Sequence, residues 1–160
     1  VVPHYGAGAF IAGASGGEGI LLAHNGTGWS DPVFYNLGKV SVGLQAGVSA
    51  GSIAMVLLTD EAVNSFRKHN NFSLTADAGL SVVTWSRRAQ ADLGRGHDVI
   101  VWSDTAGLLG NVSVGVADIW LDRSENEAYY GQPVNAPQVL NGEVSGARAN
   151  NRLLDALNNL

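Results

Sequence analysis

The fold is decided by the uncharged stretch VSVGLQAGVSAGSIAMVLLT, which runs from Val40 to Thr59. Its length is that of a membrane-spanning helix, and its regularly spaced glycines match a small-residue helix-pairing pattern. The periodicity excludes a helix, because from Val40 to Gly51 apolar residues alternate strictly with Ser, Gly or Gln. Repeated glycine would also weaken a helix by about 1 kcal/mol per residue. We therefore predict a half-buried strand, a turn near Gly51-Ser52, and a fully buried strand over Ile53–Leu58.

The same alternation recurs further along the chain. Apolar and small or polar residues alternate over Phe72–Val82 and again over Val112–Val116. The phase slips at Ala117-Asp118, where we expect a β-bulge. Further strands, two of which flank a hairpin turn at Asn25–Gly28, are predicted at Glu18–His24, Trp29–Tyr35 and Val99–Trp102, the last of them short and buried.

Helices are predicted to be few and short. One opens at Thr59, which acts as its cap, and continues to Lys68. Another covers Ser124–Tyr130 and stops at Gly131, whereas Gln132–Gly142 has two prolines and is interpreted as an ordered connection. An amphipathic helix from Ala147 ends the chain. The expected fold is mainly β (α+β): an antiparallel barrel or sandwich with two or three short helices, in a single domain of residues 1–160.

The amino-acid composition excludes several classes of function. The chain has 160 residues, of which 46% are hydrophobic and only 14% are charged, so it is long and apolar enough for one packed core. The net charge of −5 with 9 basic residues is a poor match to a broad nucleic-acid surface. The absence of Cys excludes disulfides, thiolate nucleophiles and Cys-ligated metal sites.

Two serines lie in G-x-S-x-G sequences, the pattern of a hydrolase nucleophile elbow. These are Ser15 and Ser49. The elbow needs a strand before the serine and a helix after it, and neither sequence is followed by a helical pattern. The four histidines are scattered without metal-ligand spacing. We therefore expect a protein that is not an enzyme and has no metal or cofactor, with a hydrolase using Ser15 or Ser49 as the weakest alternative.

Several predicted strands have one apolar face and one face of mostly Gly, Ser or Thr. A solvent-facing strand surface normally has longer polar side chains. A face of small residues permits close approach, either by another part of the same protein or by a ligand chain. The sequence leaves both interpretations open.

Basic residues cluster at two places in an otherwise acidic chain. Arg67 and Lys68 end the first predicted helix, and Arg87, Arg88 and Arg95 occupy one loop that has only Asp92 to oppose them. Together they are five of the nine basic residues. We regard them as candidate contacts for a lipid phosphate, with the loop first and the helix end second. The alternative is that the loop is simply a solvated surface.

Short motifs over nearly the whole chain resemble the SYLF domain family. In chain order they are Val1–Pro3, Gly6–Gly19, Trp29–Pro32, Gly43–Gly47, Val56–Ala62, Phe72–Leu74 and Tyr129–Gly131. The family is a phosphoinositide- and lipid-binding module, also described as actin-regulating in yeast. The resemblance implies a compact β-rich domain without enzymatic activity that contacts an anionic lipid or membrane surface.

Two departures from the family pattern bear on this expectation. Family members usually have a helical segment before the position of Val1–Pro3, and this sequence lacks it. Thr84–Arg88 replaces a Gly-Pro-x-Gly-Arg-Asn-like stretch, so Arg87 or Arg88 takes the place of the family arginine. The resemblance gives less support to actin as a partner of a bacterial relative.

Bacterial relatives of this family are often exported or lipid-anchored. The resemblance therefore implies an exported lipoprotein of the periplasm or outer membrane, and a cytoplasmic location stays open. The alternative function is a structural or protein-interaction module of the cell envelope. The oligomeric state and the lipid headgroup are not indicated by the sequence.

Overall fold

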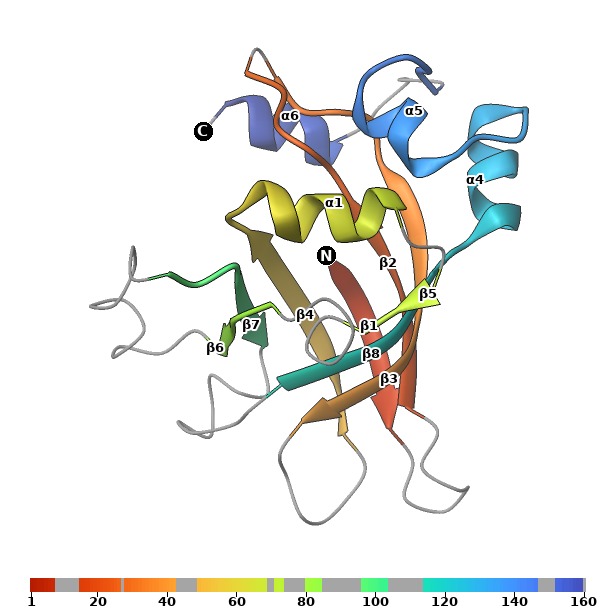
Figure 1. Ribbon diagram of the computed structural model, residues 1–160. Coiled ribbons are helices and arrows are strands. Elements are labelled where there is room, and N and C mark those ends of the chain that lie inside the picture. The colour runs from red at the N-terminus through yellow and green to blue at the C-terminus, as the bar shows by residue number, and fades with distance from the viewer. Residues whose placement is uncertain are drawn as a thin grey trace. The chain divides into compact units, whose positions relative to one another are not determined.

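The computed structural model describes the chain in the segments that are coloured in Figure 1. These are residues 1–7, 15–26, 28–42, 49–68, 71–73, 80–84, 96–103, 114–146 and 152–159. The chain divides into two compact units: unit 1 is Val1–Gly19 with Asn36–Trp120, and unit 2 is Ile20–Tyr35 with Leu121–Leu160.

The described strands form one sheet in the order β5-β8-β3-β2-β1-β4-β7-β6. Their bounds are β1 (Val2–Ala7), β2 (Ser15–Leu21), β3 (Val33–Val42), β4 (Ser49–Leu57), β5 (Asn71–Phe72), β6 (Val82–Thr84), β7 (Val99–Ser103) and β8 (Val114–Leu121). β1 pairs antiparallel with β2 and β4, β4 with β7, and β5 with β8, whereas β6 and β7 are parallel. The predicted α+β fold with mainly antiparallel strands is confirmed. β5 and β6 end the order, so the described strands form an open sheet and not a closed barrel.

The decisive sequence stretch is β-structure, as its alternation predicts, but the predicted turn is wrong. Val40–Val42 belongs to β3, and β4 runs without interruption through Gly51-Ser52. The pairing of β1 with β4 shifts register between Val2 and Tyr5, opposite Gly51–Ile53. The Gly-Ser pair thus accommodates an irregularity inside a strand. Residues 43–48 lie outside the described residues. None of the helices in the described segments is long and apolar enough to cross a membrane.

Four helices lie in the described segments, one more than the sequence predicts. They are α1 (Asp60–Lys68), α4 (Arg123–Tyr130), α5 (Ala136–Leu140) and α6 (Arg152–Asn158). The predicted caps are confirmed: Thr59 Oγ1 accepts a bond from the Ala62 N–H at 3.3 Å, and Gly131 ends α4 with a φ of 69°. The C-terminal helix is also confirmed, and the start predicted for it at Ala147 lies outside the described residues.

The extra helix, α5, lies in the segment that the prolines mark as a connection. Pro137 stands in its first turn, where a missing N–H costs no helical hydrogen bond. Asn135 and Gln138 form a reciprocal capping box, with bonds of 3.0 and 3.1 Å. Because proline is tolerated only in this first turn, it marks the beginning of a helix here and not its absence.

Each unit has its own buried apolar side chains. In unit 1, Phe66 of α1 meets Phe72 of β5 edge to face, with ring centroids 4.8 Å apart. Ile53, Val99 and Val101 add fully buried side chains from β4 and β7. In unit 2 the buried apolar side chains come from the segment after β2 and from β3, α5 and α6, and they are Ala23, Val33, Tyr35, Ala136, Val139, Leu140 and Leu154.

The expected bulge in β8 coincides with an unusual backbone. Asp118 has a φ of 53°, in the left-handed region that non-glycine residues rarely adopt. Two residues later the ring of Trp120 lies over Gly38 of β3, where a Cβ would be 2.6 Å from the ring. A Cβ on Gly16 would likewise be 3.0 Å from the Leu37 carbonyl oxygen. At these two glycines the small residue serves internal packing.

Candidate functional site

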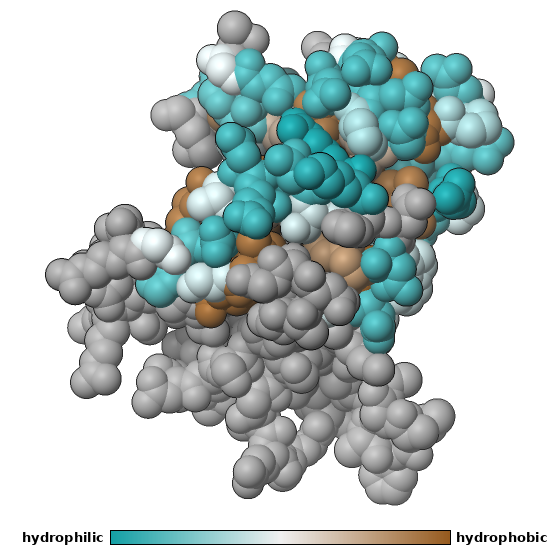
Figure 2. Space-filling model, in the orientation of Figure 1, coloured by the Kyte–Doolittle hydropathy of each residue, from teal (hydrophilic) through white to brown (hydrophobic). Residues whose placement is uncertain are grey.

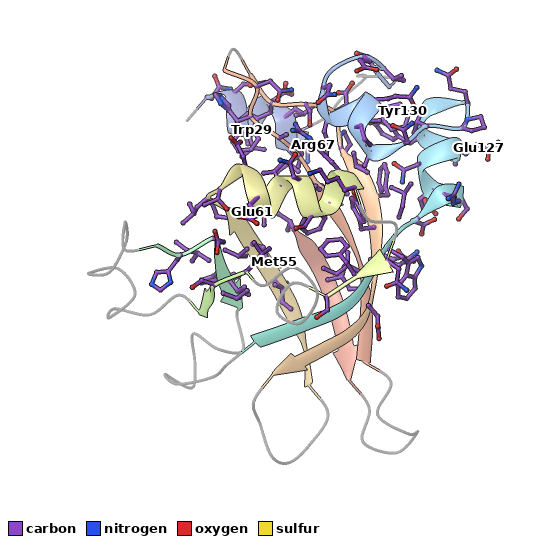
Figure 3. All side chains as sticks on the ribbon, viewed as in Figure 1. Trp29, Met55, Glu61, Arg67, Glu127 and Tyr130 are labelled. Carbon is purple, nitrogen blue, oxygen red and sulfur yellow. The ribbon has the colours of Figure 1, made fainter. Side chains whose placement is uncertain are left out.

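The structure places two of the five predicted lipid contacts, at the basic end of α1. Arg67 and Lys68 form the last turn of the helix, where positive charge favours the helix dipole. Lys68 is exposed, whereas Arg67 is partly buried, and its Nε is enclosed with no hydrogen-bond partner. Figure 3 shows Arg67 on α1, which also carries Glu61 near its other end. Of the two cations, Lys68 is therefore the more exposed.

The other three predicted contacts, Arg87, Arg88 and Arg95, lie outside the described residues. The described ends of their segment are Thr84, which ends β6, and Gly96, which precedes β7. The basic loop therefore stays a prediction.

The beginning of α1 is tied to the strand β7 by the carboxylate of Asp98. Its Oδ1 accepts the Thr59 hydroxyl at 2.9 Å, and its Oδ2 accepts the Ser81 N–H at 2.8 Å. These bonds, with a smaller contribution from the charge of His97, hold the pKa of Asp98 below its usual value. The carboxylate thus stays ionised and fixes the junction between β4, α1 and β7.

The serines of the two G-x-S-x-G sequences do not stand at nucleophile elbows. Ser15 begins β2 and Ser49 begins β4, and both pair with Ala7 of the strand between them. A different serine, Ser81, has its Oγ 3.1 Å from His97 Nδ1. The adjacent carboxylate of Asp98 bonds to the Ser81 backbone and to Thr59, so this group lacks the orientation of a catalytic triad. Among the described residues no group of His, Asp and Glu is arranged to hold a metal ion.

One side of β4 is apolar and exposed at Val56 and, just beyond the strand, at Leu58, which contradicts the prediction of a fully buried strand over Ile53–Leu58. The predicted buried strand over Val99–Trp102 is buried at its first three residues and exposed only at Trp102. Val56 is 56% exposed, Leu58 49% and Trp102 45%. Ile53 on β4 and Val101 on β7 are fully buried. Since successive residues of a strand point to opposite sides, one side of β4 faces the core and the other presents Val56 to solvent, whereas Ile100, which pairs with Val56, is buried. We call the set Ala54, Val56, Leu58 and Trp102 the apolar face.

The sequence contained a partial signal for this surface. Apolar residues on both sides of Ile53–Leu58 show that neither side is an ordinary polar surface. Periodicity assigns a residue to one side of a strand but does not say what covers that side. The exposure of Val56 and Trp102 therefore required the structure.

Two of the family-like motifs meet in unit 2. The Tyr130 hydroxyl donates to the Pro32 carbonyl oxygen at 2.7 Å, and the Asp31 carboxylate accepts the Gly146 N–H at 3.1 Å. Burial, followed by the charge of Asp31, raises the pKa of Tyr130. Figure 3 shows Tyr130 on α4. The motifs Trp29–Pro32 and Tyr129–Gly131 thus serve to hold α4 against the segment that precedes β3.

The hairpin that leads into this segment is also as predicted. His24 and Trp29 form a bridge with their rings edge to face, and Asn25 N–H donates to the Gly28 carbonyl oxygen at 2.8 Å. The Asn25 side chain reaches the Leu140 carbonyl oxygen at 2.7 Å. This turn is therefore fastened to the end of α5.

Comparison with known proteins extends the resemblance. The family model described as "Ysc84: Las17-binding protein actin regulator" matches residues 38–160. "SH3 domain-containing YSC84-like protein 1" of Xenopus laevis is 26% identical over 139 residues, which are 84% of this chain and 42% of that protein. "Protein YSC84" of Saccharomyces cerevisiae is 28% identical over 154 residues, which are 92% of this chain and 33% of that protein.

The chain thus spans less than half the length of these relatives. No solved structure gives a significant match. The family match includes the segments that hold α1, the apolar face and the five candidate basic residues. It shows that this chain belongs to the Ysc84 family, which is the SYLF family that its motifs resemble.

Proposed function

We propose that this domain is a non-enzymatic module that binds anionic lipid at a membrane surface. The observation that carries the proposal is the family match over residues 38–160. Lipid binding is what the resemblance of the motifs to the SYLF family implies. The matched segment holds Arg67, Lys68, Arg87, Arg88 and Arg95, which are five of the nine basic residues.

The basic residues are few but concentrated. Each Lys or Arg near an anionic membrane contributes about 1 kcal/mol. Arg87, Arg88 and Arg95 together would supply about 3 kcal/mol, roughly a hundredfold in affinity. This is too little for stable anchoring, so an apolar contact or a lipid anchor must contribute as well.

The test is co-sedimentation with vesicles of phosphatidylcholine that contain a fraction of anionic lipid. The wild-type chain is compared with Arg87→Ala/Arg88→Ala/Arg95→Ala in about 0.1 M salt. The matched control is Arg123→Ala/Arg148→Ala/Arg152→Ala, which removes the same number of positive charges elsewhere in the sequence. We expect a large loss of binding for the first variant and little change for the control.

Equal losses in both variants would show that only net charge matters and would remove the loop from the site. No binding by the wild type would contradict the proposal for this chain. Lys68→Ala tests the basic end of α1 separately, because Lys68 is exposed and its removal leaves the core intact.

Actin regulation is the second candidate, because the description of the matching family names it. This chain spans 33% of "Protein YSC84", so that activity can belong to the other part of that protein. Co-sedimentation with actin filaments, run with the same variants, separates the two functions.

A further inference from the structure

We propose that the apolar face of unit 1 docks an amphipathic helix of a partner protein, and that the helix has basic residues at one end. The proposal concerns other residues than the basic ones assigned to lipid. It rests on three observations: the exposure of the apolar face, its length, and the acidic groups at one end of it.

The apolar face is a stripe along β4, with Trp102 beside one end of it and the buried Ile100 beside its middle. Ala54, Val56 and Leu58 alternate along β4 and just beyond it, so they lie on one side of the strand. Trp102 pairs directly with Ala54 in the antiparallel register of β4 and β7, and Ile100 pairs with Val56. Leu58 continues the pairing, because its N–H donates to the Asp98 carbonyl oxygen at 2.8 Å.

The length of this stripe suits a short helix. At about 3.3 Å per residue, Ala54 to Leu58 covers about 13 Å. A helix rises 1.5 Å per residue, so about nine residues, or two to three turns, would lie along the stripe. A helix with apolar residues at i, i+3 or i+4, and i+7 would place its side chains between Trp102, Val56 and Leu58.

Acidic groups gather where the stripe ends. Asp60 and Glu61 follow Leu58 after one residue, Thr59, and both are exposed in the first turn of α1. Asp98 bonds to Thr59 at the same junction. The basic residues Arg67 and Lys68 stand at the other end of α1, about 13 Å away for a helix of nine residues. Figure 3 places Glu61 at the end of α1 that adjoins β4, and Figure 2 shows brown, apolar surface beside the teal surface of α1.

This charge arrangement selects the kind of partner. An anionic membrane would be repelled by the three carboxylates, whereas Lys or Arg at the end of a helix would be attracted by them. Large apolar side chains that are exposed side by side mark an interaction surface, because single scattered ones are the norm. A basic amphipathic helix therefore satisfies both the apolar stripe and its acidic end.

The test uses a synthetic helical peptide of about 14 residues with a leucine stripe, lysines at one end and neutral polar residues elsewhere. A second peptide has glutamate in place of every lysine. Fluorescence anisotropy of each labelled peptide is titrated with the full chain. We expect the lysine peptide to bind, the glutamate peptide to bind at least tenfold more weakly, and salt to weaken the binding.

Variants then locate the binding site. Val56→Thr/Leu58→Thr, which places a smaller and more polar side chain at two exposed positions, should reduce affinity for the lysine peptide at least tenfold. Asp60→Asn/Glu61→Gln should reduce it several-fold and flatten its salt dependence. The matched control is Trp120→Thr, which removes another exposed aromatic side chain of unit 1 and should leave the affinity unchanged.

Three outcomes would overturn the proposal. They are equal binding of both peptides, no binding of the lysine peptide, and binding that Val56→Thr/Leu58→Thr does not weaken. If those two substitutions abolish vesicle binding instead, the face belongs to the membrane and not to a protein partner. The lipid proposal is tested by vesicle binding of the variant that lacks Arg87, Arg88 and Arg95. Its failure is therefore distinguishable from failure of the helix-docking proposal.

Discussion

At two positions a glycine lets an aromatic ring occupy the space of a side chain. A Cβ on Gly38 would meet the far edge of the Trp120 ring, and a Cβ on Gly146 would overlap the Tyr129 ring. Trp120 is 38% exposed and has solvent on one side. Tyr129 lies between Phe34 and Tyr130, with ring centroids 5.3 and 4.9 Å away. The two rings therefore differ in how easily they can move.

This difference predicts unequal costs for the same substitution. Gly38→Ala should lower the free energy of unfolding by about 1 kcal/mol, because Trp120 can shift toward solvent. Gly146→Ala should lower it by about 3 kcal/mol, because Tyr129 is packed against aromatic rings on two sides. Urea denaturation followed by circular dichroism measures both. The opposite order would show that Tyr129 is the more mobile ring.

Asp98 makes the stability of the domain depend on pH. Its folded-state pKa lies below the usual value, so its ionised form stabilises the fold above the unfolded-state pKa. This contribution is lost as the pH falls through the lower folded-state pKa. We expect Asp98→Asn to be less stable than the wild type at about pH 7 and the gap to narrow by about pH 3.

The control for Asp98 is Glu127→Gln. Glu127 is an exposed carboxylate on α4 and makes no side-chain bond within the described part of the chain. Its substitution should leave the urea midpoint nearly unchanged at both pH values. If Asp98→Asn is less stable than the wild type by the same amount at both pH values, the loss of stability comes from the changed shape of the side chain and not from its lost charge.

At the scale of the elements, α4 depends on its cap. Asp122 accepts the Glu125 N–H at 3.0 Å and the Ser124 hydroxyl at 2.8 Å, both at the first turn. Asp122→Ala should lower the free energy of unfolding by about 1 kcal/mol, the usual value of an N-cap. Glu127→Ala, in the middle of the same helix, should change it by less than about 0.5 kcal/mol. Thermal denaturation of the two variants, compared with the wild type, gives both values.

The sequence predicts best those helices that have a typical capping residue at one end. Thr59 and Gly131 identify an N-cap and a left-handed C-cap, and both act as such in the structure. Two elements were predicted wrongly because glycine and proline each occur in more than one kind of structure. Proline is also found in the first turn of a helix, as at Pro137, and glycine is also found at a strand irregularity, as at Gly51-Ser52. The local capping box of Asn135 and Gln138 decides the use of the proline, whereas the use of the Gly-Ser pair depends on pairing with the distant strand β1.

The candidate site was predictable to a smaller extent than the fold. Charge counts alone identify Arg67 and Lys68, and the structure places them together at the end of α1. The apolar face was not predictable, because the sequence does not say what covers each side of β4. A binding surface depends on what remains uncovered, which is a property of the assembled sheet.

At the scale of the whole molecule, the net charge opposes the proposed lipid function. The chain has a net charge of −5, so an anionic membrane repels it at a distance. Five of its nine basic residues nevertheless lie at the two candidate lipid contacts. Attraction at short range and repulsion at long range therefore act on the same protein, and salt screens the long-range part first.

Binding to anionic vesicles should for this reason have a maximum at intermediate salt. The Debye length is about 30 Å at 0.01 M, which is larger than the radius of gyration of about 15 Å expected for this chain length. At this salt concentration the whole net negative charge of the protein is repelled by the membrane. At about 0.1 M the Debye length is about 10 Å, so only the basic residues nearest to the surface act, and at about 1 M their attraction is screened too. Co-sedimentation across this range should rise and then fall, and Arg87→Ala/Arg88→Ala/Arg95→Ala should abolish the maximum. A steady decrease from the lowest salt would mean that the net charge of the molecule has no influence on how it meets a membrane.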